Sequence, residues 1–412
     1  MVSVAVVDGY STGRFLTRKL REGGARVVHV QSQPTIGEYF LGGFRAADYD
    51  CDLGYEPSVS ELGSVLRGLA VDAVVAGTES GVLLADALSN LLLLPGNDHS
   101  TRFGRRDKKR MAAAAEAAGL ATPRSRTFND ADDAAAWYAI AGVGDVVVKP
   151  LNSAGSDHVR FCRNVPAVRT AVTAVLASAN VYGEPNREVL VQERVRGVEF
   201  YVNAVSHEGT HRAAEIWRYT KLESPDGAPL YDFEEPVPLG SGVAEQVKAF
   251  AFAVLDALGV QSSASHTELM LTERGPVLIE CGARLGGATL PDVVERHLEV
   301  SQAALYARAL LDPPTLKAFD DAAPRPTQRL RNVALRNQRV GRVRSERWRE
   351  CIQALPTTVA VTASLSAGTE LPVTRDLLTS PGYVYFASDD PAAVKRDYLR
   401  LRQLEVEGLY TS

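Results

Sequence analysis

The sequence predicts a protein of the α/β and α+β class, with a parallel α/β domain at the N-terminus and a small α+β domain at the C-terminus. The chain has 412 residues, too many for one simple core. Strand and helix patterns alternate over the first hundred residues, as in a parallel sheet with helices on both faces. The middle of the chain instead carries strand patterns with short polar connections, which favour an antiparallel sheet. We expect domains over residues 1–96, 97–312 and 313–412.

The composition is that of an ordinary globular protein, with 45% hydrophobic and 23% charged residues and a net charge of −5. Because it predicts no basic face, we expect no nucleic-acid partner. The four cysteines are far apart and form no CxxC pair, which argues against a disulfide framework or a zinc site. The chain opens without a signal-peptide pattern, and its most apolar window, interrupted by Asp86 and Asn90, is too short to span a bilayer. We therefore expect a cytoplasmic protein without a membrane partner.

The N-terminal elements follow from apolar runs and helix-ending glycines. Buried-type strands are expected at residues 2–10, 26–30 and 71–77, and helices at 11–24 and 79–92. The first helix ends at Gly23 and Gly24, since glycine readily ends a helix.

The middle and C-terminal elements follow in the same way. Helices are expected at residues 107–119 and 243–259, and strands at 145–150, 158–162, 188–195 and 199–206. The Pro- and Asp-rich segment 311–329 is a candidate linker. Beyond it, the patterns predict strands at 358–365 and 382–388 and an amphipathic helix at 391–405.

Two glutamates twelve positions apart are the first candidate site. The segments "SHTELML" and "PVLIEC" read as a hairpin, and if its loop is centred on Arg274, Glu268 and Glu280 lie directly opposite each other. Cross-strand Cβ atoms lie about 5 Å apart, and paired like charges are destabilising unless a cation such as Mg²⁺ neutralises them. Strict alternation puts Met270 and Leu278 on the same face, an apolar patch suited to a nucleotide base. The alternative is a hairpin whose acids face water.

A lysine and a small-residue loop form the second candidate site. Lys149 ends an apolar strand, and the loop that follows contains Ser153, Gly155 and Ser156. Small residues let backbone N–H groups approach an anion closely. No GxxxxGK[ST] motif is present, so this is not a Walker-type loop. The loop is either a phosphate-binding element or an ordinary hairpin connection.

The order of these motifs resembles the ATP-grasp superfamily over essentially the whole chain. An Asp-Lys pair precedes a helix, then come the strand-end Lys-Pro with its Ser/Gly loop, "QERVRGVE", and a hairpin with two glutamates that ends in E-x-x-x-R. The segments "VVDGYSTGRFL", "GTESGVLLADALSNLLLLPGND" and "LIECGARLGG" are most similar to bacterial L-amino acid ligases, dipeptide-forming enzymes of secondary metabolism. The resemblance implies a pre-ATP-grasp domain, an ATP-grasp domain and a small C-terminal domain like that of the carboxylase branch.

The resemblance also implies ATP and Mg²⁺ as cofactors, with Mn²⁺ as an alternative ion, and a role for each motif residue. It implies phosphate contacts for Lys108, Lys149, Ser153, Gly155 and Ser156. It implies adenine or ribose contacts for Glu193, Val195, Glu199 and Leu278. It implies that Glu268 and Glu280 hold the metal. The chain departs from the family at Gly282, where many members have an Asn ligand, and at His158, where a glycine is common.

The reaction implied by the family joins a carboxylate to an amine through an acylphosphate. A guanidinium binds carboxylate and phosphate oxygens in bidentate fashion, so Arg284 is expected to hold the intermediate. The alternative is a surface arginine paired with Glu280. His266 shares the strand face of Glu268 and is expected to contact substrate or act as a base, unless it is structural. Cys281 points to the other face and is expected in the core.

Residues 221–242 carry four prolines and the acids Asp232, Glu234 and Glu235. Long structureless segments are often lids, and an acidic lid would favour a cationic substrate or an α-amino group. The alternative is a variable surface insertion.

The leading hypothesis is an ATP-dependent ligase for small-molecule carboxylates and amines, amino acids in particular, with a homodimer expected from the superfamily. The alternatives are a bicarbonate-activating, biotin carboxylase-like enzyme and a non-catalytic nucleotide-binding protein. An NAD-dependent oxidoreductase is a further alternative. The opening segment has only Gly9 and Gly13 in place of GxGxxG, and that function leaves the glutamate pair unexplained.

Overall fold

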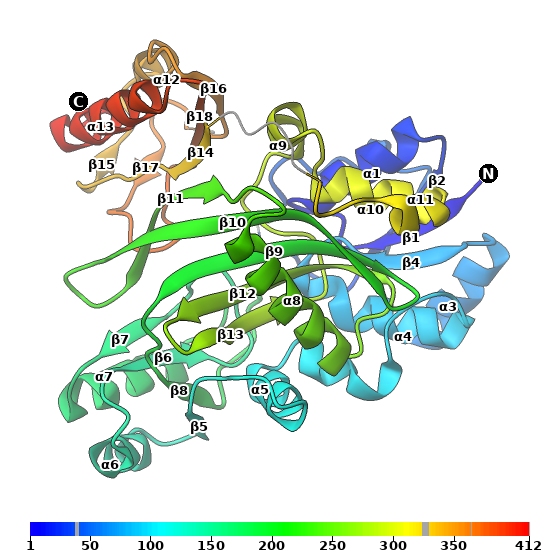
Figure 1. Cartoon of the computed structure of the whole chain (residues 1–412), viewed down its shortest axis with the longest axis horizontal. Helices are drawn as coiled ribbons and strands as arrows, with labels where there is room; N and C mark the ends of the chain where they lie inside the picture. Colours follow the sequence, from blue (N-terminus) through cyan, green and yellow to red (C-terminus); the bar gives the residue numbers. More distant parts are fainter. Residues whose placement is uncertain (38–40, 324–328, 364, 412) are drawn as a thin grey trace.

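The N-terminal part of the chain forms a parallel sheet, as predicted, and its four strands have the order β3-β2-β1-β4 (Figure 1). The structure is a computed structural model and describes residues 1–37, 41–323, 329–363 and 365–411. Alternate residues of β1 pack against α1 on one face and against α3 and α4 on the other. The elements are β1 (Ser3–Val7), α1 (Gly13–Glu22), β2 (Arg26–Gln31), η1 (Ala46–Asp48), β3 (Cys51–Tyr55), α3 (Val59–Gly68), β4 (Ala73–Ala76), η2 (Glu79–Gly81) and α4 (Val82–Leu92).

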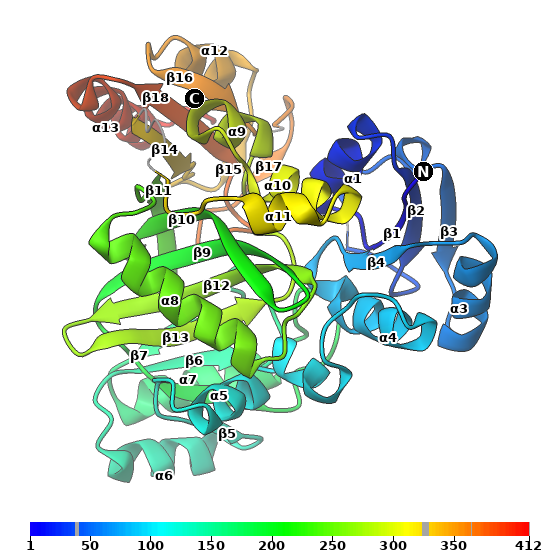
Figure 2. The same ribbon diagram turned by 45° about the vertical axis from the view of Figure 1, so that its right-hand side comes forward.

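A second sheet of four antiparallel strands has the order β5-β8-β6-β7. Helices α6 and α7 pack together and cover one of its faces (Figure 2). Its elements, with the two helices that lead to it, are η3 (His99–Arg105), α5 (Lys108–Ala117), β5 (Ser125–Phe128), α6 (Ala131–Ala141), β6 (Val146–Pro150), β7 (Arg160–Cys162), α7 (Val165–Leu176) and β8 (Val189–Glu193).

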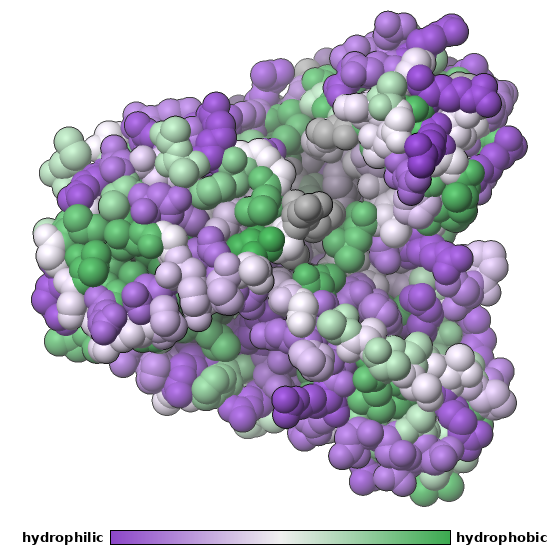
Figure 3. Space-filling view, turned by 180° about the vertical axis from the view of Figure 1, so that it is seen from behind, coloured by the Kyte–Doolittle hydropathy of each residue, from purple (hydrophilic) through white to green (hydrophobic). Residues whose placement is uncertain are grey.

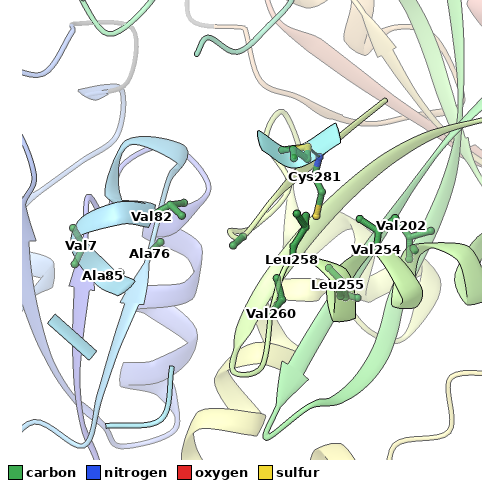
Figure 4. Packing of buried hydrophobic residues seen from close by; sticks show 14 of the residues in the cluster. Val7, Ala76, Val82, Ala85, Val202, Val254, Leu255, Leu258, Val260 and Cys281 are labelled. Atoms are coloured by element: carbon green, nitrogen blue, oxygen red, sulfur yellow. Dashed lines mark hydrogen bonds between the residues drawn. The ribbon is translucent and has the colours of Figure 1, made fainter. Parts of the chain in front are cut away.

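A third, larger sheet has eight antiparallel strands in the order β13-β12-β9-β10-β11-β14-β18-β16. Helix α8 lies across one face, where Val254 and Leu255 pack against Val202 of β9 (Figure 4). Cys281 points into the same apolar cluster, as predicted. The elements up to α11 are β9 (Val198–His207), β10 (Thr210–Glu223), β11 (Pro229–Pro236), α8 (Gly242–Ala257), β12 (Ser263–Thr272), β13 (Gly275–Gly282), α9 (Pro291–Leu298), α10 (Gln302–Leu311) and α11 (Pro314–Ala318).

The C-terminal part adds three strands to this large sheet and covers them with α12 and α13 (Figure 1). The sheet therefore runs on across the domain division predicted at residue 312, and that division stays a prediction. The C-terminal elements are β14 (Arg329–Ala334), β15 (Gly341–Arg342), α12 (Arg347–Gln353), β16 (Thr358–Val361), β17 (Glu370–Leu371), β18 (Tyr383–Ser388) and α13 (Pro391–Glu407).

The face of the large sheet opposite α8 carries a row of polar and aromatic side chains. Residues directly opposite each other on paired strands share a face, so the strand register fixes the order of the row. From β13 to β18 the row contains Glu280, Glu268, Tyr201, Trp217, Tyr219, Glu234, Asn332 and Tyr385. One side of this sheet thus packs on an apolar core with α8, and the other carries this mixed row, in which Tyr201, Trp217 and Tyr385 are buried in a cluster that includes residues of α9.

Several predictions of local structure are wrong. Segment 221–242 is not a structureless lid, because Lys221–Glu223 end β10 and Pro229–Pro236 form β11 opposite it. The strands predicted between 145 and 206 belong to two sheets, and α7 rather than a short loop connects two of them. The proposed linker at 311–329 contains helix α11. Residues 324–328 of this linker lie outside the described part of the chain, and so does residue 364 of the strand predicted at 358–365.

Candidate active site

A cavity of about 840 Å³ lies between the second sheet and the polar face of the large sheet. Seen from behind, the surface is hollowed between the lobe that carries α13 and the lobe that carries α6 and α7 (Figure 3). A volume of this size is typical of sites for cofactors and drug-sized ligands. The predicted site residues that line this cavity are Lys108, Lys149, Ser153, Gly155, Ser156, Glu193, Val195, Glu199, His266, Glu268, Glu280 and Arg284.

Leu278 is the one predicted site residue that does not line the cavity. It is buried in the core around α8, and its N–H donates to the carbonyl of Ala121 over 2.9 Å. The cause is a β-bulge. Leu269 pairs with Leu278 but Glu268 pairs with Glu280, so Ile279 is an extra residue that shifts the alternation of faces. The prediction that Leu278 shares a face with the acids is therefore wrong, and Ile279 lines the cavity instead.

Two buried lysines form the cationic end of the cavity. Lys108 follows Asp107, which caps the N-terminus of α5, and its Nζ lies 2.9 Å from Glu280 Oε1. The same Nζ donates to the carbonyl of Ser153 over 3.2 Å. Lys149, near the end of β6, is buried, and burial lowers its pKa to about 8 even though Glu280 opposes that shift. An anion bound here would offset the cost of burying both ammonium groups.

The loop between β6 and β7 has left-handed backbone at three positions. Gly155 has a φ of +68°, Ser156 of +62° and His158 of +51°. Such a φ is strained for residues with a side chain, and the surrounding hydrogen bonds hold the conformation. Asp157 lies 2.6 Å from His158 Nδ1 and accepts from Ser153 Oγ over 2.7 Å. His158, which stands where a glycine is common in the family, is therefore held by its contact with Asp157 of the same loop.

The pair of Glu268 and Glu280 lies as predicted, in direct opposition across the β12–β13 hairpin, and both side chains line the cavity. Tyr219 donates to Glu268 Oε1 over 3.3 Å, and His266 Nε2 lies 3.3 Å from the same oxygen. Burial opposes ionisation of Glu268, but the hydrogen bond from His266 and the charge of Lys221 outweigh it and lower its pKa.

This donor set fits a magnesium ion. Mg²⁺ binds through one or two carboxylates, and water and substrate phosphates complete its coordination shell. Within the described part of the chain, no three His, Cys, Asp or Glu side chains are grouped so that they could hold a metal. Glu268 and Glu280 would thus hold the ion only together with non-protein ligands.

Lys221 is paired with Glu199 inside the cavity. Its Nζ lies 2.6 Å from Glu199 Oε1 and above the rings of Tyr219 and Tyr231, at 4.4 and 4.3 Å from their centroids. Burial lowers the pKa of a lysine, but Glu199 outweighs that effect and the pKa of Lys221 is raised. Lys221 is therefore a fixed positive charge at the cavity wall.

Arg284 pairs with Glu79 of the N-terminal part rather than with Glu280. Its Nε lies 2.8 Å from Glu79 Oε2, and Arg106 lies 3.7 Å from Glu79 Oε1. Burial opposes ionisation of Glu79, but these two arginines outweigh it and lower its pKa. The alternative of a surface arginine is wrong, because the side chain of Arg284 is only 16% exposed.

The carboxylate of Glu79 also explains why residue 282 is a glycine. A Cβ built on Gly282 would lie 2.7 Å from Glu79 Oε2 and 3.3 Å from Arg284 Nε. A Cβ does not approach another atom as closely as 2.7 Å, so an Asn at this position would displace the carboxylate of Glu79, and with it the partner of Arg284. The absence of the ligand common in the superfamily is thus coupled to the presence of the Glu79–Arg284 pair.

A second cavity of about 160 Å³ adjoins the first, and Arg284, His266 and Glu268 line both. Three parts of the chain contribute its remaining walls. The N-terminal sheet provides Ser11, Thr12 and Gly77–Glu79, the middle provides tyrosines and Glu234, and the C-terminal part provides Leu377, Leu378 and Tyr383.

The sequence did not identify Glu79, Lys221 or Tyr219 as site residues. Glu79 follows the carboxyl end of β4, and ligands of parallel sheets often bind at that edge, so its position was a usable signal. Tyr219 and Lys221 are two residues apart on β10, which was not predicted to be a strand. No local sequence pattern identifies either residue as part of a site.

Comparisons with known proteins show the family of the chain. A family model described as the ATP-grasp domain matches residues 143–292. The chain is 30% identical to dapdiamide A synthase of Enterobacter agglomerans, over 98% of this chain and 96% of that protein. It is 25% identical to alanine–anticapsin ligase of Bacillus subtilis over 64% of this chain and 59% of that protein.

Solved structures show the same fold. An L-amino acid ligase from Bacillus licheniformis superposes with a TM-score of 0.74 at 18% identity and covers 98% of this chain and 97% of that one. A carboxyaminoimidazole ribonucleotide synthase from Aspergillus clavatus, complexed with ATP, superposes with a TM-score of 0.69 at 14% identity and covers 98% of each chain. Within the described residues, none of the helices has the length and apolar character needed to cross a membrane.

Proposed function

The chain belongs to the ATP-grasp family of C–N bond-forming ligases, and on that premise we propose that it joins a carboxylate to an amine, with amino acids as the substrate class, in a reaction that requires ATP and Mg²⁺. The observation that carries this proposal is the meeting of the two cavities at Arg284, His266 and Glu268. The larger one has the size of a nucleotide site, and the smaller one has room for a small metabolite. The phosphate to be transferred and its acceptor would meet at the shared wall.

The proposed reaction has two steps. A carboxylate oxygen of the first substrate bonds to the γ-phosphorus of ATP, the bond from that phosphorus to the bridging oxygen breaks, and ADP leaves. The amine nitrogen of the second substrate then bonds to the acyl carbon, the carbon–oxygen bond to phosphate breaks, and inorganic phosphate leaves. The nitrogen loses a proton in this second step.

In the first step the residues of this chain position and neutralise charge. Phosphoryl transfer depends on alignment and on stabilisation of charge on the transferred group. Lys108, Lys149 and the 153–156 loop would hold the phosphates, and Glu268 and Glu280 would hold Mg²⁺. When bound, the ion would supply Lewis-acid charge neutralisation at the phosphate oxygens.

At the other end of the larger cavity, we propose that Glu193 and Val195 bind adenine through the backbone and that Glu199 and Lys221 contact the ribose. Ile279 and Met270 take the place that we first assigned to Leu278 beside the base. Both are apolar, and both lie on the hairpin that also carries the carboxylate pair.

In the second step Arg284 would hold the acylphosphate and stabilise the oxyanion that forms when the amine attacks. A guanidinium provides donors in a fixed planar array, and Glu79 holds this one in place. His266 has Nδ1 2.7 Å from Asn203 Oδ1, and its Nε2 lies beside Glu268. This arrangement holds the imidazole at the wall that both cavities share, where it would contact the substrate.

The experiment that tests the proposal is ADP release in the presence of Mg²⁺ across single and paired amino acids, with mass spectrometry of the products. We expect one acid–amine pair to stimulate ADP release and to yield an amide with the loss of one water. Arg284→Ala should keep the fold and lose turnover. ADP release that depends on bicarbonate alone, or on no acid–amine pair, would contradict the proposal.

Three further expectations belong to the proposal. We propose that the enzyme works in the cytoplasm, as a homodimer, in the biosynthesis of a secondary metabolite. The named relatives support the last of these, because their names are those of ligases for dapdiamide and anticapsin. Size-exclusion chromatography with light scattering would test the dimer.

A further inference from the structure

Strand β11 carries three acids, and one of them is enclosed by arginines of the C-terminal part. Asp232 Oδ1 lies 2.8 Å from Arg402 and 3.0 Å from Arg336, and Tyr398 donates to its Oδ2 over 2.7 Å. Asp232 is buried and fully partnered. It therefore attaches the hairpin to the C-terminal strands and cannot serve a ligand.

The last of the three acids faces away from the second cavity. Glu235 pairs in register with Arg218, and its carboxylate lies 2.8 Å from Arg218 and 2.7 Å from Arg331. Neighbouring strand residues point to opposite faces, so Glu235 and Glu234 lie on different sides of the sheet. The ion pairs of Glu235 with Arg218 and Arg331 are therefore structural.

Glu234 is the acid that remains, and it lines the second cavity. Its described partners are uncharged. Asn332 Nδ2 donates to Oε1 over 2.7 Å, and the hydroxyl of Tyr201 hydrogen-bonds to the carboxyl group. Asn332 also donates to the carbonyl of Ala288, which fixes the amide in place. Among the side chains that the structure describes, no lysine, arginine or histidine forms an ion pair with Glu234. A carboxylate removed from water without a cation is costly, and an incoming cation would relieve that cost.

The sheet register places Glu234 at a useful distance from the site of phosphoryl transfer. Tyr219 is directly opposite Glu234 on β10, and its hydroxyl reaches Glu268. Glu234 lies three strands from Glu268 and is offset by two residues along the strands, so the two backbones are separated by about 14 Å across the sheet and about 7 Å along it. Both residues line the second cavity, so a small molecule bound there would lie between them.

We propose that Glu234 binds a protonated amino group on the substrate whose carboxylate is activated, and so selects an amino acid over an acid that lacks the amine. This inference rests on the proposed function and names the charge that its first substrate must carry. The ammonium would lie against Glu234, and the carboxylate of the same molecule would point toward Arg284 and Glu268. Tyrosines 219, 231 and 383 would enclose the part between them.

The surroundings of Glu234 agree with a role of this kind. Burial raises the pKa of Glu234 to about 8; Asn332 and Tyr201 oppose that shift, Glu215 adds to it and the distant Lys221 reduces it. At pH 7 the empty site therefore holds a largely neutral carboxyl group. Binding of an ammonium would ionise it and release a proton, which calorimetry in buffers of different ionisation enthalpy would detect.

The test compares Glu234→Gln with Glu235→Gln, a matched change one residue away on the other face. ADP release is measured with the amino acid substrate and with the same acid lacking its amino group, and KM for ATP is followed in parallel. We expect Glu234→Gln to raise KM for the amino acid at least tenfold, to leave KM for ATP unchanged, and to lose the preference over the desamino acid. Glu235→Gln should behave like the unmodified enzyme.

The outcomes separate this inference from the function on which it rests. If the unmodified enzyme prefers the amino acid and Glu234→Gln keeps that preference, the assignment of Glu234 is wrong and the ligase function stands. Equal losses in both variants would also overturn the assignment, because they would indicate damage to the hairpin. If the unmodified enzyme releases no ADP with any amino acid, the function and the assignment fail together.

Discussion

The two cavities that meet at Arg284 balance their carboxylates in different ways. In the larger cavity each acid has a cationic or polar neighbour, such as Lys108 beside Glu280 and Lys221 beside Glu199. In the smaller cavity the partners of Glu234 are an amide and a hydroxyl. The acids named in the larger cavity thus have cationic partners without a ligand, whereas Glu234 in the smaller cavity has no cationic partner among the described residues.

This difference indicates what each cavity does when its ligand arrives. Lys108 bridges Glu280 and the backbone of the phosphate loop, so a bound metal and phosphates would exchange its partners. Among the described residues, Glu234 has no cationic partner to exchange. Its ligand would bring the missing cation, and this contrast orders the predictions below.

The largest effect is expected at the metal-binding pair. Glu280→Gln keeps the size of the side chain but removes the charge, so turnover should fall by about 10²–10³-fold, the loss that follows removal of one preorganised electrostatic group. The measurement is steady-state ADP release over a magnesium titration, and the apparent affinity for Mg²⁺ should weaken as well. Glu273→Gln, at the exposed tip of the same hairpin, is the control. Near-native turnover of Glu280→Gln at saturating Mg²⁺ would remove Glu280 from the site.

A smaller effect is expected at Gly282, between the two cavities. Gly282→Asn brings in the residue common in the superfamily, but its side chain would collide with Glu79, and overpacking of this kind costs about 1–3 kcal/mol. We expect kcat to fall by roughly 10- to 100-fold through displacement of Arg284. Gly68→Asn, where an added Cβ meets nothing within 4 Å, is the control.

A double-mutant cycle tests the cause of that loss. In a Glu79→Ala background the collision is absent, so Gly282→Asn should add little to the loss already caused by Glu79→Ala. Fully additive losses would show that Gly282 and Glu79 act independently. An increase in activity of Gly282→Asn alone would show that the position accepts a ligand without any cost to Arg284.

The last effect concerns stability rather than turnover and belongs to the second cavity. The pKa of Glu234 is about 8 in the folded protein and 4.5 by its ordinary value, so the folded state binds more protons between these pH values. The free energy of unfolding must then fall as pH rises from about 4.5 to 8, by at most about 1.4 kcal/mol per pH unit from this group. Urea unfolding of the unmodified protein and of Glu234→Gln across this range gives the difference. If the two pH profiles are parallel, the carboxyl group does not titrate as described.

Much of the fold could be predicted because its strands have strong local patterns. The apolar runs of β1, β2 and β4 are buried on both faces, so they stand out as parallel strands. The pairing of Glu268 with Glu280 followed from the turn residues between them. The β10–β11 hairpin was missed because charged residues alternate with aromatics along it, and their ion-pair partners come from distant segments such as 329–336 and 398–402.

The residues of the site could be predicted where they belong to motifs of regular spacing. They could not be predicted where their position depends on long-range packing. The residues predicted around the phosphates and the metal do line one cavity. Leu278 was misplaced because a one-residue bulge reverses the faces of a strand, and the sequence gives no sign of it. Glu79 was missed because it meets Arg284 across 205 positions of sequence, and no local pattern records that contact.

The central claim is that a substrate carboxylate is activated by the γ-phosphate of ATP, and an oxygen-isotope experiment tests it most directly. The acid is labelled with ¹⁸O in both carboxylate oxygens and turned over with ATP, Mg²⁺ and the amine, and the phosphate is examined by mass spectrometry. An acylphosphate predicts one ¹⁸O in each inorganic phosphate released and none in the nucleotide. Unlabelled phosphate, or label in AMP, would contradict the account.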